Sequence, residues 1–153
     1  MKTPIRASDI GWRILPVSLP PSAAIRDHAR LVHVIQDAQQ PMRLRLASGR
    51  DLAFAQLRAA NRKTPLFLLT LGPARVIHMP GELFIEYQLA AQDMAPGSFI
   101  AMAAYGDYGP GYIGTRIAYS QGGYETGPVS RTSPDVEDVL MPAVRQLLTA
   151  PER

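Results

Sequence analysis

The chain has 153 residues and a mass of 16.7 kDa, the size of one ordinary domain. Apolar residues make up 46% of it and charged residues 19%, so a buried core is expected and disorder by composition is excluded. The absence of cysteine excludes disulfide scaffolds, thiolate zinc sites and cysteine nucleophiles. The net charge of +3 comes from scattered arginines and does not indicate nucleic acid binding, and no apolar run approaches the roughly 20 residues of a membrane span.

The first 62 residues are predicted to form an edge strand followed by helices. Residues 11–19 have the pattern of an extended segment, and Pro16 in its middle restricts it to a sheet edge. Apolar residues at spacings of three and four predict a helix over about 23–38. A second helical stretch follows over about 42–61, and Gly49 is expected to end it and let it restart.

A strand–helix–strand unit is predicted from residue 64 onward. The continuous apolar run 66–71 is typical of a strand buried on both faces, and 75–79 is expected to return beside it, as a hairpin or as two neighbouring strands. A helix over 82–93 and a buried strand over 98–104 follow. This order indicates an α/β fold, a layered sheet with packed helices.

Residues 105–127 are unusual in composition, because seven of the twelve glycines and five of the six tyrosines fall there. Long ordered loops of this kind are often functional, and glycine lets backbone approach a ligand closely. Arg116 and Arg131 are candidates for holding an anion. A surface loop whose rings lie over the sheet remains the alternative. A final helix, begun by Ser133 and its following proline, is expected to reach about Leu148 and to bend at Pro142.

The titratable residues offer one candidate outside that loop. His28 and His33 lie five apart, roughly 140° around a helix, and cannot share a metal from one face. They and His78 are more simply explained as hydrogen-bonded or surface histidines. Glu82 stands where a buried strand ends and a helix is expected to begin, so it is a candidate metal ligand or general base. A first-turn acid that complements the helix dipole is the alternative for Glu82.

Three segments together resemble the neutral/alkaline (non-lysosomal) ceramidase family, and above all its shorter bacterial members. They are residues 79–82 (Met-Pro-Gly-Glu), 105–115 (Tyr-Gly-Asp-Tyr-Gly-Pro-Gly-Tyr-Ile-Gly-Thr) and 121–126 (Gln-Gly-Gly-Tyr-Glu-Thr). The likeness covers about 64–148. It implies that residues 1–153 are a single segment, the C-terminal part of a larger catalytic domain. In that segment 1–62 would form the edge strand and helices, and 63–153 the core, the site loop and the last helix.

The resemblance implies a zinc amidase that cleaves the N-acyl bond of ceramide, or of a related lipid amide, into sphingosine and a fatty acid. Glu82 would be the carboxylate ligand of zinc and Tyr112 the tyrosine ligand, while Tyr124 would hydrogen-bond the substrate amide or its developing oxyanion. Two histidine ligands are expected from a missing N-terminal part, so this segment alone should be inactive. The loop residues assigned to substrate binding are Tyr108, Thr115, Tyr119 and Glu125. The family's habit implies a secreted or periplasmic protein.

Two readings from other classes stay open. The tyrosine-rich loop is also compatible with a non-catalytic lipid- or glycan-binding module that uses the rings as a stacking platform. An α/β domain with no site of its own is the third.

Overall fold

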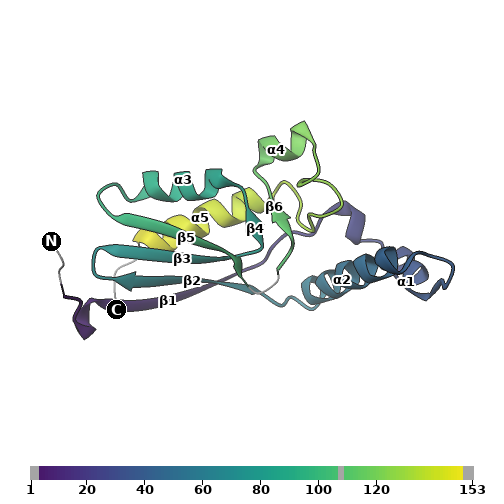
Figure 1. Cartoon of the computed structure of the whole chain (residues 1–153), viewed down its shortest axis with the longest axis horizontal. Helices are drawn as coiled ribbons and strands as arrows, with labels where there is room; N and C mark the ends of the chain where they lie inside the picture. The colour runs from purple at the N-terminus through teal and green to yellow at the C-terminus, as the bar shows by residue number, and fades with distance from the viewer. Residues whose placement is uncertain (1–3, 107–108, 150–153) are drawn as a thin grey trace.

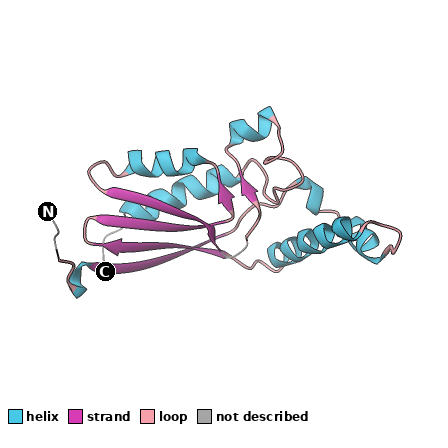
Figure 2. Ribbon diagram, viewed as in Figure 1, coloured by secondary structure: helices cyan, strands magenta, loops and turns pink. Residues whose placement is uncertain are grey.

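The computed structural model describes residues 4–106 and 109–149, and it has the expected mixed α/β architecture (Figures 1 and 2). Helices and strands follow one another in this order: η1 Ala7–Asp9, β1 Ile10–Val17, η2 Ala23–Ile25, α1 His28–Gln36, α2 Met42–Ala59, β2 Thr64–Leu71, β3 Ala74–Pro80, β4 Glu82–Leu83, α3 Ile85–Met94, β5 Phe99–Gly106, β6 Tyr112–Ile113, α4 Arg116–Gln121 and α5 Val136–Thr149.

The main sheet has four strands in the order β1-β2-β3-β5. β1 and β2 are antiparallel, β2 and β3 form the expected hairpin, and β5 returns through α3 to lie parallel to β3. The strand–helix–strand prediction is therefore confirmed, as is the place of the Pro16 strand at an edge. β5 forms the other edge, so the 66–71 strand is paired on both sides.

The hydrophobic core lies between one face of this sheet and two helices, α3 and α5 (Figure 1). Leu66, Leu68 and Ile77 point from the sheet into it, and Leu140 and Val144 of α5 meet them with almost no exposed surface. Pro142 lies inside α5, which continues to Thr149. Burial of this stripe offsets the hydrogen bond that proline removes.

The opposite face of the sheet carries apolar side chains that the described helices leave open to solvent. Ile10, Trp12 and Ile14 point outward from β1, and Trp12 is 57% exposed. Phe67 of β2 lies between Trp12 and His78, with ring centroids 5.3 and 5.2 Å away and the rings tilted against each other. The expectation that 66–71 is buried on both faces is therefore wrong, because burial alternates along β2 and only the face under α3 and α5 is fully covered.

The structure differs from the prediction in both N-terminal helical stretches: the first is interrupted and the second is continuous. The stretch predicted as one helix over 23–38 is divided into η2 and α1, because the Asp27 side chain accepts a hydrogen bond from Arg30 N and starts α1 there. Helix α2 runs unbroken through Gly49, contrary to the predicted interruption. A single glycine costs a helix only about 1 kcal/mol, and pairing with α1 outweighs that cost.

None of the described helices is long and apolar enough to cross a lipid bilayer.

Candidate functional site

Glu82 and Tyr112 lie side by side on a second, two-stranded sheet. β4 and β6 run parallel with Glu82 opposite Tyr112, and Glu82 N donates to Gly111 O at 2.9 Å. Helix α3 begins only at Ile85, so the reading of Glu82 as a first-turn helix acid is wrong. The strand pairing holds a carboxylate and a phenol at one end of the main sheet, where β3 turns into β4.

Two glycines allow this close pairing. Gly81 has φ +70°, and a Cβ there would lie 2.5 Å from Gly111 O. Gly111 has φ +80°, and a Cβ there would lie 2.2 Å from Val129 O. Both positions have a left-handed backbone and no room for a side chain. Glycine is therefore required by sterics immediately before Glu82 and immediately before Tyr112.

Tyr105 joins the same cluster from the end of β5. Hydrogen bonding to Glu82, together with the negative charge of that carboxylate, raises the pKa of Tyr105. Tyr105 also has φ +65°, a conformation that costs a non-glycine residue about 1–3 kcal/mol. Backbone bonds fix it there, because Tyr105 N donates to Gly81 O at 2.6 Å.

Tyr112 responds to the same carboxylate. The charge of Glu82 raises the pKa of Tyr112, with desolvation and a hydrogen bond to Glu82 as further causes. The ring of Tyr124 meets that of Tyr112 edge to face, with centroids 6.0 Å apart. Tyr124 itself is 66% exposed. Two phenols, those of Tyr105 and Tyr112, thus lie near Glu82, and the phenol of Tyr124 contacts Tyr112.

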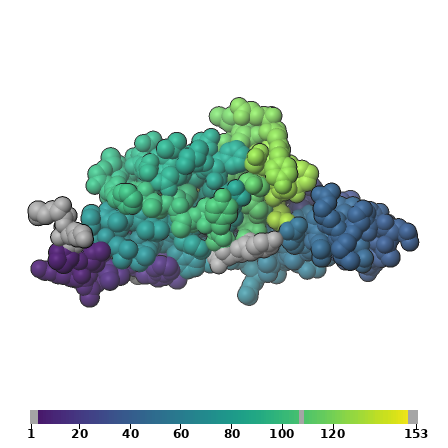
Figure 3. Space-filling model, in the orientation of Figure 1, coloured from purple at the N-terminus to yellow at the C-terminus, as the bar shows by residue number. Residues whose placement is uncertain are grey.

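These residues line a cavity of about 710 Å³ whose other wall is helix α2. The members from the sheet and loop side are Gly81, Glu82, Tyr105, Gly109, Gly111, Tyr112, Tyr124, Pro128, Val129 and Arg131; those from α2 are Arg43, Leu44, Ala47, Arg50 and Asp51. In Figure 3 the α1–α2 lobe stands beside the segment that follows α4. The volume lies in the range of small-molecule sites.

An ion pair ties the two walls together. Arg131 Nε lies 2.8 Å from Asp51 Oδ1, and both side chains are mostly buried, at 12% and 18% exposed. The N–H direction departs from that of a good hydrogen bond, so the contact is chiefly electrostatic. Arg131, which was considered for holding an anion, is thus already paired with the carboxylate of Asp51.

The rest of the loop is fastened to the fold around α4. Thr115 caps α4 by accepting from Ala118 N, and the Tyr119 hydroxyl lies 2.8 Å from those of Ser130 and Thr132.

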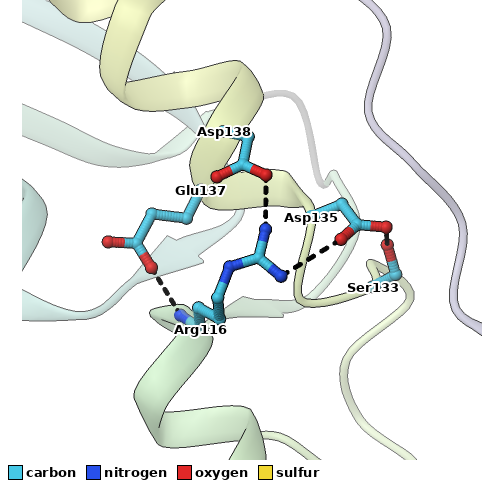
Figure 4. Close-up of polar contacts among 5 residues, drawn as sticks. All are labelled: Arg116, Ser133, Asp135, Glu137 and Asp138. Carbon is cyan, nitrogen blue, oxygen red and sulfur yellow. Dashed lines mark hydrogen bonds and ion pairs between the residues drawn. The ribbon is translucent and has the colours of Figure 1, made fainter.

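Arg116 spans from α4 to Asp135 and Asp138 at the start of α5, and its backbone N donates to Glu137 (Figure 4). Arg116 therefore already holds carboxylates of the protein, in place of the external anion considered for it.

The predicted site residues divide accordingly. Glu82, Tyr112 and Tyr124 meet at the cavity. Thr115 and Tyr119 make hydrogen bonds that hold the loop in place. Among the described residues, neither of them lines the cavity. Glu125 is exposed near Tyr112 and contributes to raising its pKa. Tyr108 lies outside the described residues.

Sequence reasoning missed two features of the site. It placed Tyr105 only within the tyrosine- and glycine-rich stretch 105–127, because nothing in the sequence shows the left-handed turn that brings it to Glu82. It also missed the α2 wall, although Arg43, Ala47 and Arg50 recur at the spacing of one helical face. That recurrence was the available signal.

The oxygen atoms of Glu82 and Tyr112 are of a type that zinc binds, but they are fewer than the ligands that a zinc ion needs. Glu82 and Tyr112 are two oxygen donors in one cavity, whereas zinc takes four ligands. In the described residues, no three histidine, aspartate or glutamate side chains come together as a metal cluster.

Comparison with known proteins gives a fold relationship. No protein-family model matches the chain, and no curated protein matches it in sequence. The crystal structure of neutral ceramidase from Pseudomonas aeruginosa matches over 92% of this chain, with a TM-score of 0.54 and 14% identity. The chain has a ceramidase-like fold.

The match spans 28% of that ceramidase's own length. A ceramidase complexed with C2 matches 56% of this chain and 14% of its own, with a TM-score of 0.43 and 22% identity.

Proposed function

We propose that this chain contributes part of the active site of a zinc-dependent, ceramidase-like amidase that hydrolyses the N-acyl bond of ceramide or a related lipid amide. The observation that carries the proposal is the pairing of Glu82 with Tyr112 across β4 and β6, in one cavity of a ceramidase-like fold. Because two donors are fewer than zinc needs, the remaining ligands are proposed to come from a further segment of such a domain. The segment alone is then expected to be inactive.

In this proposal Glu82 and Tyr112 hold the metal. Zinc at such a site supplies a Lewis acid that polarises the amide carbonyl and lowers the pKa of water. Tyr124, set against Tyr112 by its ring contact, donates a hydrogen bond to the amide oxygen as negative charge develops on it. Tyr105 is proposed as a positioning residue, because it lines the same cavity as Glu82 and its pKa is raised by that carboxylate, which its neutral hydroxyl can orient as a donor.

Zinc titration of the chain tests this directly. A bound cation beside Tyr112 favours its phenolate, so zinc added at about pH 9 should increase the tyrosinate absorbance above that of the zinc-free chain. Glu82→Gln and Tyr112→Phe should each weaken zinc binding by about tenfold or more, measured by competition with a chromophoric chelator.

Glu86→Gln is the matched control, because Glu86 is an exposed acid on the first turn of α3 outside the cavity. Equal zinc binding by wild type and Glu82→Gln would overturn the proposal. A non-catalytic lipid- or glycan-binding module, favoured by the exposed ring of Tyr124, would instead bind its ligand equally with and without zinc.

A further inference from the structure

One side of helix α2 is apolar and open to solvent. Met42, Leu46 and Leu57 are 63%, 61% and 49% exposed, and Ala53 is exposed as well. At about 100° per residue, these four positions and Gly49 between them span about 80° of the helix circumference, so they form one continuous row, the α2 stripe. The open side of a surface helix is normally polar, and an exposed apolar row indicates an interaction surface.

The remaining sides of α2 are occupied by packing. Ala55 is buried with Leu31 of α1 in a small apolar cluster. Phe54 packs against the main core, and Asp51 is paired with Arg131 at the cavity. These contacts fix the rotation of α2 about its axis and direct the stripe away from the body. Both helices extend beyond the main sheet at one end of the molecule, where a flat partner can reach them (Figures 1 and 3).

The lobe that carries the stripe is basic. Residues 26–63, which contain α1 and α2, have eight arginines and lysines against three aspartates, whereas the rest of the chain has eight against ten acidic residues. The excess does not depend on Arg50, which already has an interaction partner, because seven cationic residues remain without it. Arg43 is exposed next to the stripe, and Arg62 and Lys63 are exposed just after α2 ends. An apolar helix side flanked by basic residues is typical of helices that lie on anionic membranes.

We propose that the α2 stripe and the basic residues around it bind an anionic lipid surface, with α2 lying along the interface. The apolar side chains of such a helix enter the boundary between head groups and acyl chains, while its arginines and lysines attract the anionic head groups. A second copy of the lobe fits this surface less well, because both partners would bring an excess of positive charge.

This inference goes beyond the proposed function, since binding to a lipid surface needs neither zinc nor turnover. It also has a consequence for the cavity. Leu44 and Ala47 line the cavity from another side of the same helix, so an α2 bound to lipid holds the cavity close to the lipid surface. A lipid amide would then have a short path from the bilayer to Glu82 and Tyr112.

Vesicle co-sedimentation of the intact chain tests the inference. The chain is mixed with vesicles of phosphatidylcholine alone, or of equal parts phosphatidylcholine and phosphatidylglycerol. It should bind the anionic vesicles about tenfold or more tighter than the neutral ones, and added salt should reduce this preference. Equal binding to the two kinds of vesicle, or no binding to either, would rule the inference out.

Leu46→Glu should weaken binding to the anionic vesicles by about tenfold or more, because it places a charge in the middle of the stripe. Leu89→Glu is the matched control, since it makes the same change at an exposed leucine of α3 and should bind as wild type does. Arg43→Gln should weaken binding by about fivefold, and Arg145→Gln, at an exposed arginine of α5, should have little effect. Urea denaturation checks that each variant is folded.

A second measurement separates the stripe from the open face of the sheet. Trp12 lies on that face, so its emission should stay unchanged when vesicles bind through α2. A shift of the emission to shorter wavelength on binding would place the lipid contact on the sheet face and refute the inference. Binding that Leu46→Glu leaves intact would refute it as well.

Discussion

At the scale of single residues, the site is organised around one carboxylate. Glu82 raises the pKa of both Tyr105 and Tyr112, because phenolates beside a carboxylate are disfavoured and the neutral hydroxyls can donate to it. A raised folded-state pKa means that these neutral phenols contribute stability below about pH 10. That contribution is lost as the pH rises through the raised values.

Glu82→Gln should therefore lower the pKa of Tyr105 and Tyr112 toward the ordinary tyrosine value, because the amide removes the negative charge that both phenols face. Ultraviolet titration of tyrosinate should show two tyrosines ionising at lower pH in the variant than in wild type. Asp93→Asn, which changes an exposed acid on α3, should leave the curve unchanged. An unchanged curve for Glu82→Gln would contradict the assignment of Glu82 as the group that raises both pKa values.

The sequence was informative about Glu82 and Tyr112 and silent about Tyr105. Glu82 could be singled out because a buried strand, a Pro-Gly turn and an acid follow one another, and Tyr112 because the loop containing it resembles that of the ceramidases. The role of Tyr105 depends on a positive φ at a non-glycine residue, which tertiary contacts impose and local sequence does not encode.

At the scale of elements, glycine is tolerated at one position of the chain and required at another. Gly49 was expected to break α2 because of its local propensity, and the helix continues through it because packing against α1 overrides a small cost. Gly81 sits where no other residue fits, with Gly111 O in the space that a Cβ needs. Propensity alone cannot separate these cases, because the difference lies in what surrounds each glycine.

Substituting alanine at the two positions should change stability in opposite directions. Gly81→Ala forces a Cβ against backbone at positive φ, so it should lower the free energy of unfolding by about 2 kcal/mol or more and disrupt the β4–β6 pairing. Gly49→Ala meets nothing within 4 Å and should raise that free energy by about 0.5–1 kcal/mol. Urea denaturation of both variants measures this, and a neutral Gly81→Ala would refute the steric account.

At the scale of the whole molecule, the two faces of the sheet differ. The edge position of the Pro16 strand, the neighbouring strands β2 and β3 and the crossover through α3 were predicted, because periodicity, proline and turn residues indicate them locally. Which face is covered was not predictable for β2, since a continuous apolar run is compatible with one covered face or two. The described helices that pack on the sheet, α3 and α5, both contribute to the same core.

The exposed apolar face of the sheet predicts that the chain associates with itself in solution. Ile10, Trp12 and Ile14 form an exposed apolar row on an edge strand, and Phe67 extends it onto β2. Exposed apolar surface and an unpaired strand edge both promote association. Trp12→Lys should therefore reduce concentration-dependent self-association, measured by sedimentation velocity, by placing a charge in the middle of the row.

Leu57→Lys is the matched control, because it also replaces an exposed apolar side chain, but on α2 away from the sheet face. It should sediment as wild type does. Trp12 is the single tryptophan of the chain, so its emission reports on this face alone. If association buries the row, the emission should shift to shorter wavelength as protein concentration rises. Association that leaves the emission unchanged, or that Trp12→Lys does not reduce, would place the contact on another surface.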